Sequence, residues 1–151
     1  MLLLSIKSEF AEKIFTGKKT VELRKGWWKP LKTGHKVLIY ETFPEQAVTG
    51  WFEVDRMIMC SIEDLWSKTR NRNAISKEEY DDYFNDSERG NGIFIRKACR
   101  FVEPITLQAL QGEPYNFGSP PQSRRHLKPN EINLWNTLIS QFKSDCKERK
   151  K

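Results

Sequence analysis

The spacing of apolar and polar residues along the 151-residue chain predicts short strands that alternate with helices. Residues 2–6 are an apolar run that predicts a buried strand, and residues 37–41 are apolar on both faces, as expected of a central strand. Residues 50–59 alternate between apolar and polar positions, which is typical of a strand with one buried face. Residues 92–102 predict the last strand, so the chain mixes strands and helices.

Helical spacing predicts four helices between and after these strands. The first is capped by Ser8 and ends at Gly17, and the second begins at Ser61. Ser76 and the glutamate three positions later form a capping box that opens a third, acidic helix. A last helix is predicted over residues 130–147, because apolar residues recur there at i, i+3, i+4 and i+7. Those residues are Trp135, Leu138, Ile139 and Phe142.

The strand that follows Gly17 combines a core face with a charged face. A period of two sends Val21 and Leu23 toward the core and turns Glu22 and Arg24 to the opposite side. A carboxylate and a guanidinium in one row cost little, because the opposite charges neutralise each other. Such a row can hold a phosphate, polarise a carbonyl group or read a base edge.

Two lysines, Lys18 and Lys19, stand at the mouth of this strand. Lys19 and Arg24 are either solvated charges at a strand end or cations that hold a phosphate. Glu22 either accepts an N–H group of a base or pairs with Arg24 and braces a cleft. The residues alone leave these alternatives open.

One signature, Gly-x-Lys-x-x-Glu-x-Arg, is matched at every position by Gly17, Lys19, Glu22 and Arg24. On this motif the chain resembles the ASCH domain family, and the likeness extends over residues 1–128. The resemblance implies an α+β fold: a small PUA-like, mostly antiparallel β-barrel with flanking helices and a C-terminal helix. It also implies an ASCH domain over residues 1–128 and a helical extension over residues 129–151, packed on the same domain.

The loop after the motif carries two tryptophans, Trp27 and Trp28, among lysines. An exposed indole stacks on any base and contributes about 1–3 kcal/mol to binding. A buried indole would instead plug the end of the barrel. The sequence leaves both arrangements open.

A second candidate segment lies within residues 103–128, which are rich in Pro, Gly and Gln and are predicted to be irregular. Two prolines stiffen it, and hydrogen-bond donors then crowd into five consecutive positions. These donors are Gln122, Ser123, Arg124, Arg125 and His126. The family resemblance suggests that this loop closes over the motif, and a solvated loop is the alternative.

Charge is unevenly distributed along the chain, whose formal net charge is +6. Residues 1–40 carry nine Lys and Arg against three Glu, and residues 101–151 carry eight basic against five acidic residues. Residues 41–100 carry nine basic against twelve acidic residues. A fold that joined the first and last segments would make one basic cleft, which favours an anionic partner such as nucleic acid. The charged tail over residues 147–151 is predicted to be a frayed, solvated end.

The three cysteines, Cys60, Cys99 and Cys146, are odd in number and widely spaced. They predict neither a zinc site nor a disulfide framework, and a reducing cytoplasm is the simplest location. His35 and His126 lie far apart and have no carboxylate at ligand spacing. We therefore expect no metal and no cofactor.

No stretch of the sequence approaches the roughly 20 apolar residues that a membrane span needs. The apolar start is also too short for the core of a signal peptide. We expect no membrane association. A monomer is favoured over a pair formed through the last helix, because a small chain gains most by packing that helix on its own sheet.

The first functional hypothesis is a binding module for RNA or a nucleotide, in which cations engage phosphate and a carboxylate or backbone group reads the base. It is supported by the family resemblance, since PUA-like relatives bind RNA or read modified bases. The candidate binding residues are Lys18, Lys19, Glu22, Arg24, Trp27, Gln122, Ser123 and Arg125.

The second hypothesis is an enzyme that uses the same cleft, with Lys19 and Glu22 as catalytic residues. One branch of the family deacetylates acetylated cytidine, and Lys19 matches the catalytic lysine of that branch. A glutamate is also needed there, which Glu22, Glu78 or Glu79 would supply. That branch has threonine at the position of Glu22, so this chain departs from its pattern. Other members have been proposed as ribonucleases, and a metal-independent ribonuclease is the other alternative.

Overall fold

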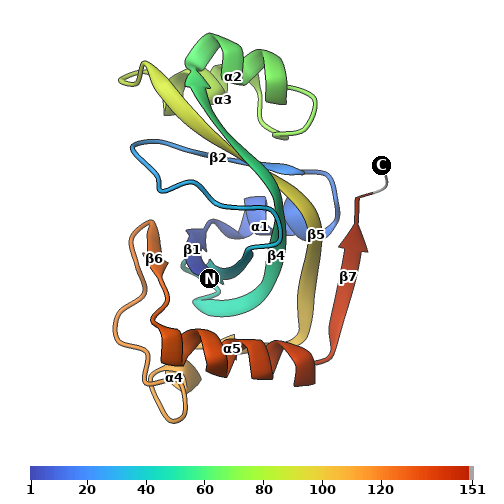
Figure 1. The fold of residues 1–151 in the computed structure, drawn as a ribbon, viewed down its shortest axis with the longest axis vertical. Helices are drawn as coiled ribbons and strands as arrows, with labels where there is room; N and C mark the ends of the chain where they lie inside the picture. Colours follow the sequence, from blue (N-terminus) through green and yellow to red (C-terminus); the bar gives the residue numbers. More distant parts are fainter. Residues whose placement is uncertain (150–151) are drawn as a thin grey trace.

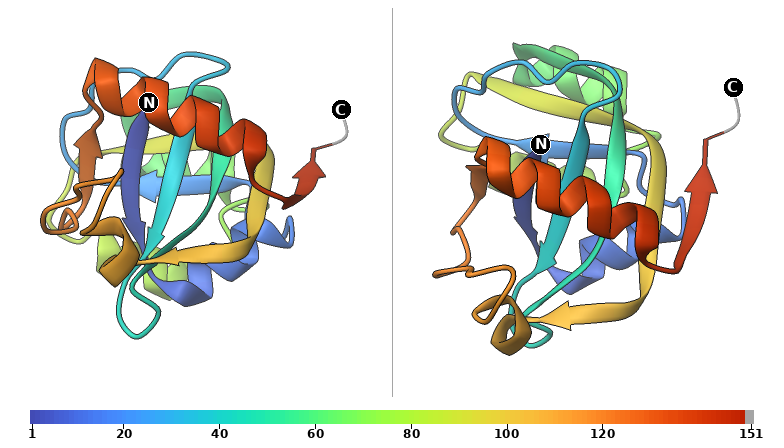
Figure 2. Two further views of the ribbon diagram at one scale, coloured as in Figure 1. Left: turned by 90° about the horizontal axis from the view of Figure 1, so that it is seen from below. Right: turned by 60° about the horizontal axis from the view of Figure 1, so that its bottom comes forward.

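The computed structural model describes residues 1–149, which form one curled sheet with helices against its faces and ends (Figures 1 and 2). The strands are β1 (Leu2–Ile6), β2 (Val21–Arg24), β3 (Lys36–Glu41), β4 (Ala47–Ser61), β5 (Arg89–Thr106), β6 (Arg124–His126) and β7 (Ser144–Glu148). The helices are α1 (Ser8–Phe15), α2 (Ile62–Thr69), α3 (Lys77–Tyr83), α4 (Leu107–Leu110) and α5 (Pro129–Gln141).

The strands follow the order β2-β5-β4-β3-β1-β6, and β7 pairs with β5. All pairs are antiparallel except β1 with β3, which is parallel. Strands β4 and β5 are long and change register at several points, and such irregularities bend a strand. The sheet therefore curls into a half-barrel, and the predicted α+β, PUA-like class is confirmed (Figure 1).

Three groups of buried apolar side chains hold the fold together. The first lies between the sheet and α1, and the second lies between the sheet and the pair α4 and α5. The third lies under α2 and α3 and takes in the core face of β2. Helices thus cover both faces of the sheet and its upper end, where α2 and α3 lie in Figure 1.

Two glycines are required by the backbone. Gly17 follows α1 with a φ of +81°, the left-handed conformation that ends helices, as predicted. At Gly50, an added Cβ would stand 2.2 Å from the carbonyl oxygen of Cys99 on the neighbouring strand. The first glycine turns the chain into the motif, and the second lets β4 pass close to β5.

The predicted helix starts are confirmed at two of three caps. Ser61 accepts a hydrogen bond from the Asp64 amide, and Ser76 forms the full capping box. The prediction for Ser8 is wrong, because α1 begins one residue earlier with Lys7 as its N-cap and no side-chain cap bond.

The last predicted helix is too long. Helix α5 ends at Gln141, and Phe142 takes an extended conformation with its ring packed edge-on against Phe101 of β5. The chain then turns along β5 and forms β7, so the tail forecast as frayed is paired as far as Glu148. Lys150 and Lys151 lie outside the described residues. The region predicted to be irregular likewise contains α4 and β6.

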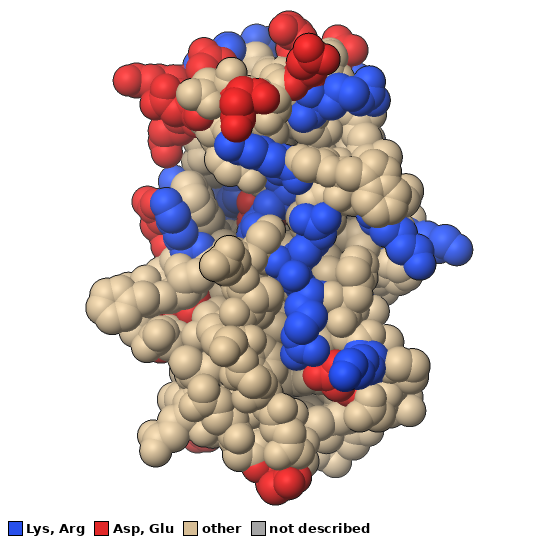
Figure 3. Space-filling view, turned by 90° about the vertical axis from the view of Figure 1, so that its left-hand side faces the viewer, with Lys and Arg blue, Asp and Glu red and all other residues tan. Residues whose placement is uncertain are grey.

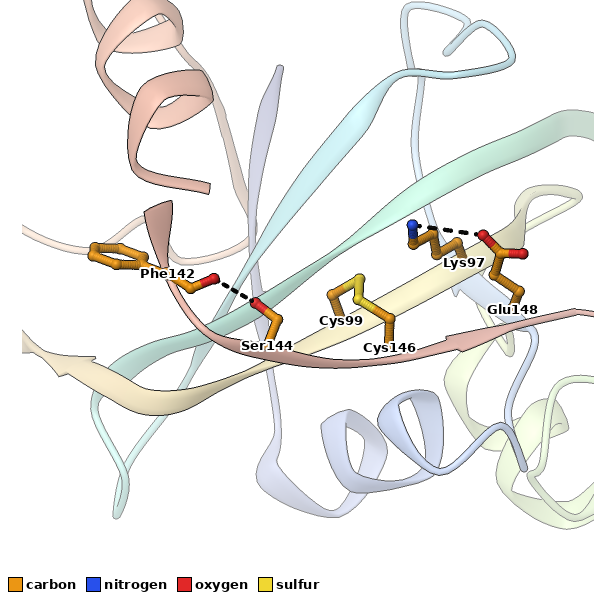
Figure 4. The surroundings of a disulfide bond; sticks show 6 residues. All are labelled: Lys97, Cys99, Phe142, Ser144, Cys146 and Glu148. Atoms are coloured by element: carbon orange, nitrogen blue, oxygen red, sulfur yellow. Dashed lines mark hydrogen bonds and ion pairs between the residues drawn. A yellow bond between two sulfur atoms is a disulfide. The ribbon is translucent and has the colours of Figure 1, made fainter. Parts of the chain in front are cut away.

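Strand β7 also corrects the prediction for the cysteines. Register places Cys146 directly opposite Cys99, with the Cα atoms 4.0 Å apart, and the two form a disulfide (Figure 4). Cys60 is the free cysteine of the described part. The disulfide removes the argument for a reducing compartment that the cysteine count had offered.

No helix within residues 1–149 is long and apolar enough to cross a membrane. Trp135 of α5 is buried in the second apolar group, so this helix packs against the half-barrel. The division of the chain into two parts at residue 128 stays a prediction.

Candidate functional site

Strand β2 places its two faces as the sequence predicts. Val21 and Leu23 are buried under α2 and α3. Glu22 and Arg24 face a cavity of about 370 Å³, to which Lys19 also contributes. Its walls further include Ser5, Lys7, Phe10, Thr42, Tyr83 and Gln122. The three charged residues of the motif thus share one hollow between β1, β2, α1 and α3.

Lys19 is a buried cation held by a backbone group. The residue is only 2% exposed, and its Nζ donates a hydrogen bond to the carbonyl oxygen of Asn73 at 2.7 Å. The ring of Phe10 lies beneath the ammonium, 5.4 Å from its centroid. Burial lowers the pKa of Lys19, an effect that Glu22 opposes and Arg24 reinforces. The group is therefore closer to proton exchange than an ordinary lysine.

Glu22 is also buried, at 6% exposure, and only one of its carboxylate oxygens has a partner within the described residues. Oε1 accepts from the amide of Leu23 at 3.1 Å and lies 3.9 Å from Nε of Arg24. Oε2 is buried without a hydrogen-bond partner in residues 1–149. Buried acceptors are normally satisfied, so this oxygen lacks a hydrogen bond that a donor group of a ligand would supply.

Arg24 joins the motif to the segment at residues 120–126. Its Nη2 donates to the carbonyl oxygen of Ser5 at 2.9 Å, and its Nη1 lies 3.4 Å from Oγ of Ser123. Ser5 in turn donates to the carbonyl oxygen of Pro121 through its hydroxyl and to that of Ser123 through its amide. This segment therefore packs beside the motif, and Gln122 reaches the cavity wall.

The other predicted binding residues lie away from this cavity. Lys18 is exposed, and Trp27 is 77% exposed in its loop. Arg125 turns toward α5, where its Nη1 donates to both carboxylate oxygens of Glu131 at 3.0 Å. None of the three lines the cavity beside β2, and their roles in binding stay predictions.

Trp28, by contrast, plugs the fold. It is 1% exposed and donates from Nε1 to the carbonyl oxygen of Lys25. Arg124 stacks on its ring and donates to the carbonyl oxygen of Trp27. The loop after the motif is thereby fixed to β6, while Trp27 projects into solvent.

Sequence reasoning missed two groups at the cavity. Tyr83, which was not among the predicted site residues, is 38% exposed at the cavity rim, and burial raises its pKa. The carbonyl group of Asn73 fixes Lys19, and no residue pattern marks a backbone acceptor. The rim position of Tyr83 could have been found, since α3 is short and its tyrosine at 80 already fills the core.

Charge is segregated on the face of the molecule in Figure 3. Most Asp and Glu of this face gather at its upper end, where α2 and α3 lie, and a band of Lys and Arg runs down its middle (Figure 3). Within residues 1–149, no three His, Cys, Asp or Glu side chains are grouped as metal ligands. His35 and His126 do meet, at a separate cavity of about 160 Å³.

The fold and this hollow define a PUA-like half-barrel in which a buried lysine, a buried glutamate and a half-buried arginine share one cavity. Residues 2–112 match the family described as a domain of unknown function, DUF365. An ASCH domain-containing ribonuclease of Zymomonas mobilis is 32% identical over 138 residues, which are 91% of each chain. This protein belongs to the ASCH domain family.

Solved structures agree with this assignment. The crystal structure of ASCH from Zymomonas mobilis superposes with a TM-score of 0.81 at 30% identity, over 94% of this chain and 95% of that one. The N-terminal domain of McrB from Staphylothermus marinus has a TM-score of 0.53 at 10% identity, over 90% and 92% of the two chains. The second likeness concerns the fold alone.

Proposed function

We propose that this protein is a ribonuclease that cleaves single-stranded RNA at the cavity beside β2. The observation that carries the proposal is the carboxylate of Glu22, which is buried with one open oxygen and is flanked by the cations of Lys19 and Arg24. The Zymomonas relative, named a ribonuclease, supports the same activity.

The groups in the cavity suit attack by a ribose 2′-hydroxyl on the adjacent phosphorus. Glu22 Oε2 takes the proton of the 2′-hydroxyl as the O2′–P bond forms. The P–O5′ bond breaks, and the Lys19 ammonium, whose pKa is lowered, gives a proton to O5′. Arg24 stabilises the negative charge that develops on the phosphoryl oxygens. The products are a 2′,3′-cyclic phosphate and a free 5′-hydroxyl.

RNA reaches the cavity along the band of cations in this proposal. Gln122 and Ser123 bind the nucleotide at the cavity, because they lie on the segment packed against Arg24. Lys18, Trp27 and Arg125 bind flanking nucleotides, with Trp27 as an exposed stacking surface. The candidate cleft is basic on this account because the cations of Lys7, Lys19 and Arg24 outnumber the carboxylates of Glu22 and Glu79.

Cleavage of a fluorescent single-stranded RNA tests the proposal, with products identified by mass spectrometry. We expect a 2′,3′-cyclic phosphate from the wild type and loss of cleavage in Glu22→Gln and Lys19→Ala. Glu63→Gln and Lys68→Ala change the same residue types on exposed positions of α2 and serve as matched controls. RNA with 2′-deoxyribose at the cleaved step should resist the enzyme. Cleavage of that substrate would rule out this mechanism.

A second candidate function is hydrolysis of a modified nucleoside such as acetylated cytidine. The cavity volume of about 370 Å³ favours it, because pockets for small ligands begin near 300 Å³. Release of acetate from acetylcytidine, lost in Lys19→Ala, together with intact RNA would replace the first proposal by this one. Salt-sensitive RNA binding without any turnover would instead favour a binding module.

A further inference from the structure

A second cavity, of about 590 Å³, adjoins the candidate site through one short segment of chain. Arg72 lines the second cavity, and its neighbour Asn73 holds Lys19 of the first. The cavity lies at one edge of β5, where β2 pairs with residues 91–94 and β7 with residues 97–101. Two strands that share an edge thus leave a charged hollow near the point where they approach each other.

Cations outnumber carboxylates in this hollow by five to three. Arg96 is paired with Glu53, and Lys97 is paired with Glu148 at 3.5 Å (Figure 4). The remaining carboxylate is that of Asp55, and three further guanidinium groups line the same cavity. These belong to Arg56, Arg72 and Arg149. The unpaired positive charge is therefore carried by arginines, which suit bidentate recognition of phosphate.

Arg72 is held in place with one end open. Its Nε donates to Oγ1 of Thr20 at 3.0 Å, and its carbonyl oxygen accepts from the amides of Thr20 and Val21. The guanidinium lies over the buried ring of Phe94, 4.5 Å from the centroid, and that of Arg56 lies 3.9 Å from the same centroid. Nη2 of Arg72 is buried without an acceptor in residues 1–149. An anionic oxygen would supply the missing acceptor.

We propose that the second cavity binds a phosphate group of the RNA, at a nucleotide outside the cleaved step, through Arg72 and Arg56. This inference rests on the proposed ribonuclease function for its ligand. The shared segment at residues 72–73 couples the two positions, because the residue that holds Lys19 directly follows the arginine that binds the phosphate. The same chemistry would also accept free phosphate, so the test has one arm for each source.

The first arm follows the Arg72 Nε–H resonance by NMR while inorganic phosphate is added. We expect a saturable shift, with affinity about tenfold weaker in Arg56→Gln, since a charge-assisted contact is lost. Arg56 is exposed on β4, so its replacement leaves the core intact. Arg70→Gln removes the same charge from an exposed position beside the segment and is the matched control. A resonance that does not respond to phosphate overturns the proposal.

The second arm measures binding of a ten-nucleotide RNA to the Glu22→Gln protein at several salt concentrations. Arg56→Gln should lower the slope of log Kd against log salt by about 0.7, the value for one phosphate of a single strand. Arg70→Gln should leave the slope unchanged. An equal effect of both variants overturns the proposal, whatever inorganic phosphate does. Cleavage is scored separately: intact RNA with the expected slopes ends the proposed function and keeps this phosphate site.

Discussion

The two cavities that adjoin the segment at residues 72–75 are both charged, yet they differ in what their charges can do. Beside β2, a lysine and a glutamate are almost fully buried, and one carboxylate oxygen has no hydrogen-bond partner in residues 1–149. In the second cavity, two of three carboxylates are paired, and a guanidinium donor stands open. An open carboxylate beside a lysine of lowered pKa can exchange protons, whereas an arginine stays charged and only binds. The two proposals therefore assign chemistry to the first cavity and anchoring to the second.

The change that tests this contrast most severely is Glu22→Gln. We expect cleavage to fall by about 10²–10⁴-fold, the usual contribution of a general base, while the Kd for RNA stays within a few-fold. Single-turnover rates and anisotropy titrations on the same preparation measure the two quantities. Equal losses of rate and affinity would mean that the carboxylate merely binds substrate.

Removing the disulfide at β7 tests the second cavity, because residues at the end of β7 form part of its wall. Cys146→Ser should lower the free energy of unfolding by about 3 kcal/mol, because the bond closes a long loop in the unfolded chain. Longer RNA should also bind more weakly, since Glu148 and Arg149 line that cavity. Urea unfolding with and without a dithiol measures the stability.

Cys60→Ser is the control for this change, because Cys60 is the free cysteine of the described part. The dithiol should destabilise Cys60→Ser as much as the wild type and leave Cys146→Ser unaffected. A dinucleotide confined to the first cavity should be cleaved at the wild-type rate by all three proteins. A slower rate in Cys146→Ser would mean that β7 also affects cleavage in the first cavity, so that the two cavities would not have separate roles.

The pH dependence of cleavage sharpens the role of Lys19. Its pKa lies below 10.5, chiefly because burial disfavours the ammonium, so the proton it donates is lost at a pH below 10.5. The rate should therefore fall as pH rises through that lowered value. Lys19→Arg stays charged to above about pH 12 and cannot give up a proton, so it should lose most of the rate together with this alkaline limb. Initial cleavage rates measured between about pH 6 and pH 11 test this pH dependence.

Stability offers an independent check on Lys19. Between its lowered pKa and 10.5 the unfolded chain binds more protons than the folded one, so the free energy of unfolding rises with pH in that window. The rise is lost as pH falls through the folded-state pKa. Lys19→Met should remove this slope. An identical pH profile in both proteins would contradict the assigned shift.

The smallest effect is expected at Arg125. Its ion pair with Glu131 is partly exposed, so Arg125→Gln should cost about 1 kcal/mol of stability or less. Cleavage of a dinucleotide should not change, because the side chain points away from the cavity beside β2. A large loss of cleavage would mean that β6 contributes to catalysis.

Local rules predicted the parts of the site that depend on neighbouring residues. The period of two in β2 set the direction of Glu22 and Arg24, and Gly17 marked the end of α1. Both follow from backbone geometry, which tertiary packing did not override here. A cleft was expected from the charged face of β2 and from the uneven distribution of charge, and Lys19, Glu22 and Arg24 do line one cavity.

Features that depend on distant contacts escaped the sequence. The apolar spacing of α5 continues through Phe142, and only the contact of that ring with Phe101 diverts the chain into β7. The disulfide then depends on a register that no cysteine spacing encodes. In the same way, the sequence grouped Arg125 with the cleft, whereas its side chain pairs with Glu131. That ion pair forms only because β6 lies beside the start of α5, which no local pattern indicates.

The position of β1 constrains the order in which the molecule can be made. This strand lies between β3, with which it runs parallel, and β6, which starts at residue 124. On a ribosome, the segment that will become β1 must wait for both neighbours to be synthesised. Arg24 gains the hydroxyl of Ser123 only at that late stage. Under the proposed ribonuclease function, the nascent protein would therefore stay inactive until β6 has been synthesised, which would spare the messenger RNA from which it is being translated.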